Sequence, residues 1–229
     1  MDMSRIIIAI DGPAASGKST AAKLLAGKLG YVYLDTGAMY RACGLAAKQS
    51  NTDIEDPQAL SILMNSINIE IQYNEQGNRT ILNHIDVSQA IREPEISRLA
   101  SAISAKRLVR EKMVELQRQM GKNSGVILDG RDIGTVVFPQ AELKFFLIAP
   151  VEVRAKRRYL ELKEKGLNPD YEVVLREMEE RDKADSSRAL APLVPASDAI
   201  QIDTGSLTID GQVDLLYCHY LKRMDELCR

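Results

Sequence analysis

The chain has 229 residues, of which 45% are hydrophobic and 27% are charged, and its formal net charge is −2. This length can bury one sizeable core, and the composition is ordinary for a globular protein. A balance this close to neutral gives no support for bulk binding to nucleic acid or to an anionic membrane, so any phosphate must be bound by local groups. The three cysteines, Cys43, Cys218 and Cys228, are widely spaced and fit neither a disulfide framework nor a zinc site, which indicates a reducing compartment.

No part of the sequence predicts a membrane segment or a secretion signal. The apolar run near the start, Ile6–Ile10, leads directly into Asp11 and is too short for either. We therefore expect a cytoplasmic protein that binds neither membrane nor nucleic acid.

The first fifty residues predict alternating strands and helices. The run Ile6–Ile10 is β-branched without alternation, which is typical of a strand buried on both faces of a parallel sheet. Apolar residues at helical spacing predict a helix over 18–29, and Gly30 is a natural stop. A strand at 31–34 and a helix at 37–48 complete a strand-helix-strand-helix order, which is characteristic of an α/β fold.

The pattern changes after residue 62. Strict alternation over 67–73, turn residues at 74–78 and a returning strand over 79–87 predict an antiparallel hairpin. We take about 62–90 as a small inserted subdomain. The remaining predicted elements are helices at about 94–104 and 106–120, strands at 125–128 and 142–148, a charged helical region at 151–189, a strand at 199–202 and a helix at 208–227.

Residues 12–19 fit G-x-x-x-x-G-K-[ST] at every fixed position, between a predicted strand and a predicted helix. Glycines let the backbone curl around phosphate oxygens, and the following helix presents its positive end to the anion. Lys18 would reach the β- and γ-phosphates, and the Ser19 hydroxyl would ligate Mg²⁺. The alternative, a glycine-rich turn that binds nothing, is disfavoured by this context. We assign nucleotide binding to Gly12, Pro13, Ala14, Ala15, Ser16, Gly17, Lys18, Ser19 and Thr20.

Asp129 ends the apolar stretch 125–128, where P-loop proteins place an acid that holds or orients the metal. Taken alone, an aspartate after a strand is more often a turn former. Because the motif at 12–19 predicts a bound nucleotide, we favour a metal-binding role over a turn and expect Asp129 to hold or orient Mg²⁺.

Three arginine clusters, at 35–41, 129–135 and 154–188, could supply the cations that phosphoryl transfer needs. The planar guanidinium grips phosphate oxygens at two points. A purely structural interpretation exists for each cluster: Asp35 and Thr36 could simply cap a helix, and the charges of the third cluster could pair along a solvated face.

Five segments of the chain are distinctive in combination. In order, they are I-D-G-P-A-A-S-G-K-S-T at 10–20, L-D-T-G-A-M-Y-R at 34–41, D-G-R-D-I-G-T-V-V-F-P at 129–139, E-R-D-K-A-D-S-S-R at 180–188 and A-P-L-V-P-A at 191–196. With these segments the chain resembles bacterial cytidylate kinases over essentially its whole length. The third segment is the most specific, and the one small departure is Thr36, where many relatives have serine.

This resemblance implies a single P-loop NTPase domain of three-layer α/β architecture with a central parallel sheet. Its core would comprise 1–61, 91–150 and 190–229, with an antiparallel-strand insert for the nucleoside monophosphate at about 62–90 and a helical lid at about 151–189. The implied reaction is direct in-line transfer from ATP, with Mg²⁺, to CMP or dCMP.

The resemblance also implies roles for individual residues. Lys18, Arg131 and Arg188 would be catalytic, and Arg157 would contact ATP from a lid that also carries Arg154 and Arg158. The acceptor site would be formed by Thr36, Tyr40, Arg41, Ser101, Arg110, Arg131, Asp132, Arg181, Asp185 and Arg188. Within it Arg41, Arg131 and Arg188 would hold the phosphate, Ser101, Arg110 and Asp132 would read cytosine, and Arg181 and Asp185 would address the sugar. Tyr40 is equally compatible with an ordinary core position.

Two other interpretations stay open. One is a kinase for another acceptor, such as AMP, UMP or shikimate. The other is a nucleotide-hydrolysing switch or a regulatory ATP-binding module, although no N-K-x-D guanine-reading motif is present. We expect a monomer whose partners are small nucleotides, and we expect His84 and His219, which lie outside every cluster, to be structural.

Overall fold

The computed structural model describes residues 5–74, 77–123 and 125–229. The chain divides into two compact units. The first comprises the described residues up to Tyr31 and those from Gly125 to Arg229, and the second runs from Val32 to Asn123. Each unit has its own sheet and helices.

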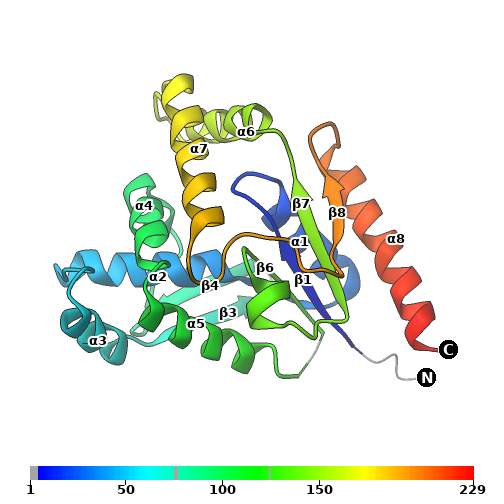
Figure 1. Ribbon diagram of the computed structural model, residues 1–229, viewed down its shortest axis with the longest axis horizontal. Coiled ribbons are helices and arrows are strands. Elements are labelled where there is room, and N and C mark those ends of the chain that lie inside the picture. Colours follow the sequence, from blue (N-terminus) through cyan, green and yellow to red (C-terminus); the bar gives the residue numbers. More distant parts are fainter. Residues whose placement is uncertain (1–4, 75–76, 124) are drawn as a thin grey trace. The chain divides into compact units, whose positions relative to one another are not determined.

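The first unit is built on parallel strands, as the sequence predicted. Its strands are β1 (Ile7–Asp11), β6 (Val126–Gly130), β7 (Leu143–Ile148) and β8 (Ile200–Asp203). They pair in the order β6-β1-β7-β8, with every pairing parallel. Ile8, Ala9 and Ile10 have no exposed surface, which confirms that β1 is buried on both faces. Helices α1 (Lys18–Leu29) and α8 (Ile209–Leu227) pack together beside these strands (Figure 1).

The carboxyl ends of β1 and β6 lie side by side. Asp11 is opposite Gly130, and Asp129 is opposite Ile10. A π-helical turn, η2 (Ile133–Val137), follows β6 directly. Ligands of open α/β sheets bind at this end of the strands. The fold therefore brings the phosphate-binding loop, Asp129 and the arginine cluster at 129–135 to the expected edge.

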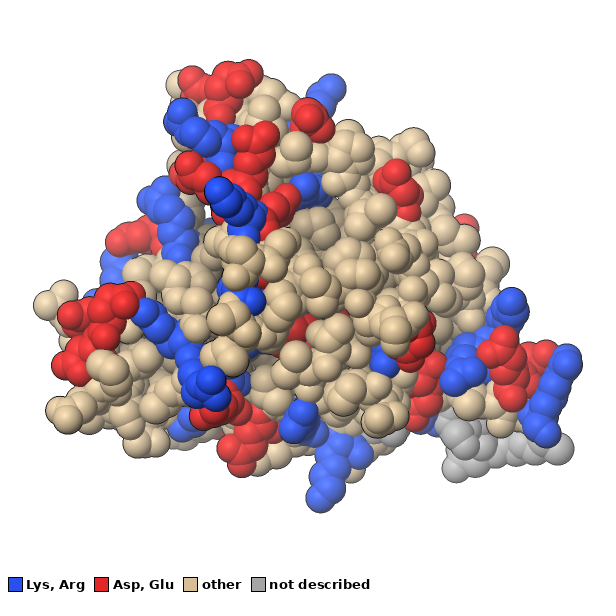
Figure 2. All heavy atoms as spheres, viewed as in Figure 1, with Lys and Arg blue, Asp and Glu red and all other residues tan. Residues whose placement is uncertain are grey.

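The charged region predicted as helical over 151–189 is two helices, α6 (Val151–Glu164) and α7 (Tyr171–Ser187), which pack against each other. Gly166, at φ +76°, follows the end of α6, and the Asp170 carboxylate caps α7 by accepting a hydrogen bond from the Glu172 amide at 2.8 Å. Acidic and basic side chains are interleaved over this helical pair (Figure 2). The small core between the two helices contains Ala155, Val174 and Met178.

The second unit combines helices with an antiparallel sheet of strand order β3-β4-β5. Its elements are β2 (Val32–Asp35), α2 (Thr36–Gln49), α3 (Pro57–Ser66), β3 (Ile69–Asn74), β4 (Gly77–Leu82), β5 (Ile85–Asp86), the short 3₁₀ turn η1 (Ala90–Arg92), α4 (Pro94–Ile103) and α5 (Arg107–Met120). Gly44 lets α2 approach α4, because a Cβ there would lie 3.1 Å from the backbone nitrogen of Ala100. The expected insert at 62–90 falls inside this unit, and its boundaries stay a prediction.

The returning strand predicted over 79–87 is not continuous. Asn83 (φ 48°) and His84 (φ 66°) are both left-handed, and they form the turn between β4 and β5. Two consecutive left-handed residues match the twist of a tight hairpin, and asparagine tolerates this conformation better than most residues. Part of the earlier predicted turn, Glu75 and Gln76, lies outside the described residues.

Within the part of the chain that the structure describes, no helix combines the length and the apolar character that a bilayer span requires.

Candidate active site

The motif lies where it was predicted: residues 12–17 connect β1 to α1, and Lys18 and Ser19 are the first two residues of α1. Gly12 adopts φ +151°, and a Cβ there would lie 2.2 Å from the Leu147 carbonyl oxygen. Gly17 adopts φ +87°, a left-handed conformation that favours glycine. Both fixed glycines of the motif are therefore required by the backbone itself.

Lys18 is buried, with only 6% of its surface exposed. Its ammonium donates a hydrogen bond to the Pro13 carbonyl at 3.0 Å, so the charge is held within the curve of the loop. This is the position from which a P-loop lysine meets the phosphates.

Ser19 and Asp129 come together although 110 residues separate them, and the Ser19 hydroxyl donates to an Asp129 carboxylate oxygen at 2.6 Å. Asp129 lies within β6 and is buried, so it is not a turn former. Among the described residues, no group of three or more His, Cys, Asp or Glu side chains could hold a metal alone. A hydroxyl beside a carboxylate nevertheless fits Mg²⁺, which takes few protein ligands and completes its shell with phosphate oxygens and water.

Asp11 is a site residue that our sequence analysis missed. It is buried, and its two carboxylate oxygens accept hydrogen bonds from the backbone amides of Ile133 (2.9 Å) and Gly134 (2.8 Å) at the start of η2. Burial raises the pKa of Asp11 to about 7, although these two amides act in the opposite direction. Asp11 thereby fixes the turn that follows Arg131 and Asp132. The only sequence signal is an acid between a buried strand and Gly12, which we interpreted as the end of the strand.

Arg131, Arg181 and Arg188 gather around Asp185. The Arg131 Nε donates to Asp185 at 2.8 Å, and Arg188 forms a longer ion pair with it at 3.6 Å. Burial alone would raise the pKa of Asp185, but the charges of Arg131, Arg188 and Arg181 outweigh burial and hold that pKa below its usual range. Asp185 is buried and the three arginines are partly buried, so pairing along a solvated helical face does not describe this cluster. The structure thus brings together all four sequence-predicted residues.

The three arginines expected on the lid differ in their environment. Arg154 is buried and donates to Asp182 at 2.6 Å. Arg157 donates to the carbonyl of Thr204 at 2.6 Å, which ties α6 to the end of β8. Arg158 forms an ion pair within α6 near the surface, as the structural interpretation predicted.

In the second unit, Asp35 both caps a helix and holds an arginine. Its carboxylate accepts from the Ala38 amide at 2.9 Å and from Arg41 Nη2 at 2.7 Å. A Cβ on Gly37 would lie 3.0 Å from Arg41 Nη1, so glycine makes room for the guanidinium. The capping interpretation is correct, and the same side chain also orients Arg41.

Tyr40, Ser101 and Arg110 lie on α2, α4 and α5 of the second unit. Arg110 is buried and donates to the Ser104 carbonyl at 3.1 Å, and its guanidinium carbon lies 5.7 Å from the centre of the Tyr40 ring. Tyr40 also packs against the core of this unit, as its alternative interpretation predicted. The neighbouring Thr36 is buried at the start of α2.

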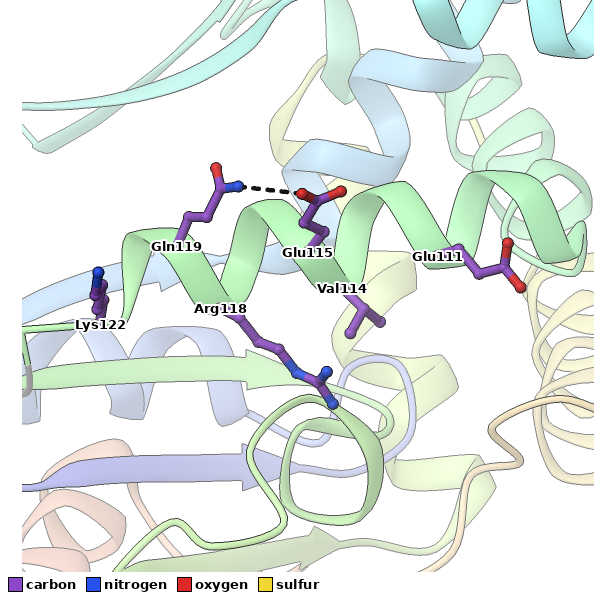
Figure 3. A pocket seen from close by; sticks show the side chains of 6 residues that line it. All are labelled: Glu111, Val114, Glu115, Arg118, Gln119 and Lys122. Atoms are coloured by element: carbon purple, nitrogen blue, oxygen red, sulfur yellow. Dashed lines mark hydrogen bonds between the residues drawn. The ribbon is translucent and has the colours of Figure 1, made fainter.

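The sequence-predicted residues therefore form two groups, one in each unit. The first unit holds the phosphate-binding loop with Asp129, Arg131, Asp132, Arg157, Arg181, Asp185 and Arg188, and the second holds Thr36, Tyr40, Arg41, Ser101 and Arg110. A shallow groove along the outer face of α5 contains none of them (Figure 3). The side chains that line this groove are Glu111, Val114, Glu115, Arg118, Gln119 and Lys122.

The fold is that of a P-loop kinase. A solved gluconokinase from Sinorhizobium meliloti 1021 superposes with a TM-score of 0.50 over 98% of this chain and 97% of its own, at 12% identity, which is a likeness of fold alone. The chain belongs to the cytidylate kinase family, whose model matches residues 8–220. A cytidylate kinase from Enterococcus faecalis (strain ATCC 700802 / V583) is 51% identical over 92% of this chain and 93% of its own length. A cytidylate kinase from Bacillus subtilis (strain 168) is 50% identical over 92% of this chain and 94% of its own length.

Proposed function

We propose that this protein transfers the γ-phosphoryl group of ATP directly to CMP and dCMP, giving ADP and the corresponding diphosphate. The observation that carries the proposal is the contact between Ser19 and Asp129 beside the loop lysine, in a chain of the cytidylate kinase family. That arrangement suits phosphoryl transfer, which depends on positioning and on neutralising charge.

In this proposal the first unit binds the donor nucleotide. The loop amides cradle the phosphates, and Lys18 stabilises negative charge that develops on the transferring group. Ser19 and Asp129 would hold Mg²⁺, which would offset the negative charge of the nucleotide phosphates. Arg157 is assigned to ATP.

The acceptor phosphate is assigned to three arginines, Arg41, Arg131 and Arg188. Asp35 and Asp185 hold two of these guanidinium groups in place at 2.7 and 2.8 Å, which lowers the entropy lost when phosphate binds. The acceptor phosphate is an oxyanion near neutral pH, so transfer requires no strong general base. Arg181 and Asp185 are assigned to the sugar, and Thr36 and Tyr40 lie next to the arginine that would bind the phosphate.

The cytosine base is assigned to Ser101, Arg110 and Asp132. An exocyclic amine needs hydrogen-bond acceptors, whereas the carbonyl and the ring nitrogen need a donor such as Arg110. Location in the cytoplasm, a monomeric state and the absence of a nucleic-acid partner stay predictions of the same proposal.

A coupled assay of ADP release tests the function directly. With MgATP, CMP and dCMP should stimulate ADP release far above the rate without acceptor, and UMP, AMP and shikimate should stimulate it less. A faster reaction with one of the other acceptors would identify a different kinase. Slow release that no acceptor stimulates would instead indicate an ATP-hydrolysing switch.

Replacing Asp132 with alanine should reduce the preference for CMP over UMP, measured as the ratio of kcat/KM, by roughly tenfold. The buried carboxylate is the acceptor that the cytosine amine requires, whereas uracil presents a carbonyl at the same position. Asp132→Asn keeps the size of the side chain and offers a donor, so it should favour UMP further. An unchanged ratio in both variants would reject the role of Asp132 in reading the base.

A further inference from the structure

Four consecutive carbonyl groups of the phosphate-binding loop accept hydrogen bonds from side chains of the first unit. The donors are Lys18 Nζ to Pro13 at 3.0 Å, Arg154 Nη1 to Ala14 at 3.4 Å, Arg157 Nη1 to Ala15 at 3.4 Å, and Thr204 Oγ1 to Ser16 at 2.8 Å. In a trans peptide the carbonyl and the following amide point in opposite directions. Anchoring these oxygens therefore orients the amides from Ala14 to Gly17, which are the groups that bind phosphate in a P-loop.

Thr204 makes the shortest of the four bonds and has no exposed surface. It follows β8, and its own backbone is held on both sides. Its amide donates to the Ile148 carbonyl at 2.8 Å, and its carbonyl accepts from Arg157 Nη2 at 2.6 Å. The hydroxyl lies 3.1 Å from the Ile148 oxygen as well, but its single proton favours the shorter contact to Ser16.

The other three donors differ from Thr204 in charge and reach. Lys18, Arg154 and Arg157 are cations on long side chains, and Lys18 is itself assigned to the phosphates. Such groups can exchange a carbonyl for a phosphate oxygen when nucleotide binds. The Thr204 hydroxyl is neutral and short, and the surrounding backbone fixes it, so we expect it to keep its bond to Ser16 when nucleotide binds.

We propose that Thr204 is a positioning residue for the donor nucleotide: its hydroxyl holds the Ser16 carbonyl and thereby aims the Gly17 amide at the phosphates. The residue acts through the loop and does not itself touch ATP. The inference deepens the proposed function, since it assumes that this loop binds ATP. Loss of the hydroxyl should weaken ATP binding and leave the affinity for the acceptor unchanged.

The test compares three variants of the full-length protein. Thr204→Val removes the hydroxyl at constant shape, and Thr204→Ser restores it. Thr208→Val is the matched control, because it makes the same chemical change at a hydroxyl that caps α8, where it accepts from the Gly211 amide at 3.2 Å. Calorimetric titration with MgATP, without any acceptor, gives Kd for each, and steady-state assays give KM for ATP and for CMP separately.

We expect Thr204→Val to raise the Kd for ATP roughly tenfold, because the buried Ser16 carbonyl loses its donor. The Kd for ATP of Thr204→Ser and of Thr208→Val should stay within about twofold of the value for the unchanged protein. In all three variants the KM for CMP should change by less than about twofold. Three results would overturn the proposal: an unchanged Kd in Thr204→Val, no rescue by serine, or equal losses for ATP and CMP. If Thr204→Val does not fold, Thr204→Ala takes its place in the same comparison.

These titrations contain no acceptor, so they separate the two proposals. Failure to phosphorylate CMP would refute the proposed function and leave the ATP-binding result intact. Normal CMP phosphorylation with an unchanged ATP affinity in Thr204→Val would refute only the role of Thr204.

Discussion

Replacing Lys18 with alanine should lower kcat for CMP phosphorylation by roughly 10²–10³-fold, which is the loss typical of removing one positioned charge from a transition state. The ammonium is buried within the loop and already aligned by its bond to Pro13. Its loss removes charge compensation at the transferring phosphoryl group, where charge redistributes during the reaction. Steady-state rates with saturating MgATP and CMP measure the effect.

The fold should survive this change, because Lys18 forms none of the apolar core of the first unit. Lys23→Ala is a suitable control, since Lys23 lies exposed on the same helix and loses the same side chain outside the loop. The control should retain normal kcat. For both variants, the urea concentration at the midpoint of unfolding should be close to that of the unchanged protein. A kcat for Lys18→Ala within threefold of normal would show that this loop does not bind the transferring phosphate.

Local patterns in the sequence predicted much of the fold. The helix expected at 18–29 has those bounds in the structure, because left-handed glycines, Gly17 and Gly30, stand at its two ends. The strand that precedes it shifts by one residue, from 6–10 to Ile7–Asp11, because the apolar run ends before the sheet pairing does. Apolar stretches also predicted two further parallel strands, at 125–128 and 142–148, which the structure has as Val126–Gly130 and Leu143–Ile148.

Features that depend on distant pairing were beyond the sequence patterns. Asp11 meets Ile133 across 122 residues, and Thr204 meets Ser16 across 188. Neither contact leaves a periodic signal, because a single hydrogen bond to a backbone group places no constraint on neighbouring residues. The break at Asn83 was missed for a different reason: only two polar residues, Asn83 and His84, interrupt the strand-like residues on either side, and the left-handed backbone dihedral angles reveal the turn.

The arginine cluster around Asp185 was predicted in part. Resemblance to the family selected Arg131, Asp185 and Arg188, whereas composition and spacing alone favoured exposed ion pairs. The structure shows why the spacing was misleading: Asp185, near the end of α7, is buried and pairs both with the nearby Arg188 and with Arg131, 54 residues earlier in the chain. Their contact is a finding, and their roles toward CMP stay predictions.

Replacing Asp11 with asparagine should change how the free energy of unfolding depends on pH. The pKa of Asp11 is about 7 in the folded chain, against an ordinary value of 3.8. Between these values the folded state binds the proton and the unfolded state does not, so stability from this group is greatest below pH 4 and falls as pH rises toward 7. The loss amounts to about 1.4 kcal/mol per pH unit in that window at most.

Urea unfolding at pH 5, 6, 7 and 8 tests this expectation. Asparagine cannot ionise, so the stability of Asp11→Asn relative to the unchanged protein should increase from pH 5 to pH 7 and then level off. Asp11→Asn should also lower the free energy of unfolding by a constant amount at every pH. The asparagine side chain has only one oxygen, and its nitrogen cannot accept the hydrogen bond of the second backbone amide of η2. All other titrating groups are common to both proteins, and their contributions cancel in the difference.

Asp198→Asn provides the matched control. The hydrogen bond from Lys144 lowers the pKa of Asp198, so this carboxylate is ionised in the folded and unfolded chain alike above pH 5. Its replacement should shift stability by the same amount at every pH tested. If the difference for Asp11→Asn were equally flat, Asp11 would be ionised throughout, and its two amide hydrogen bonds would outweigh the effect of burial.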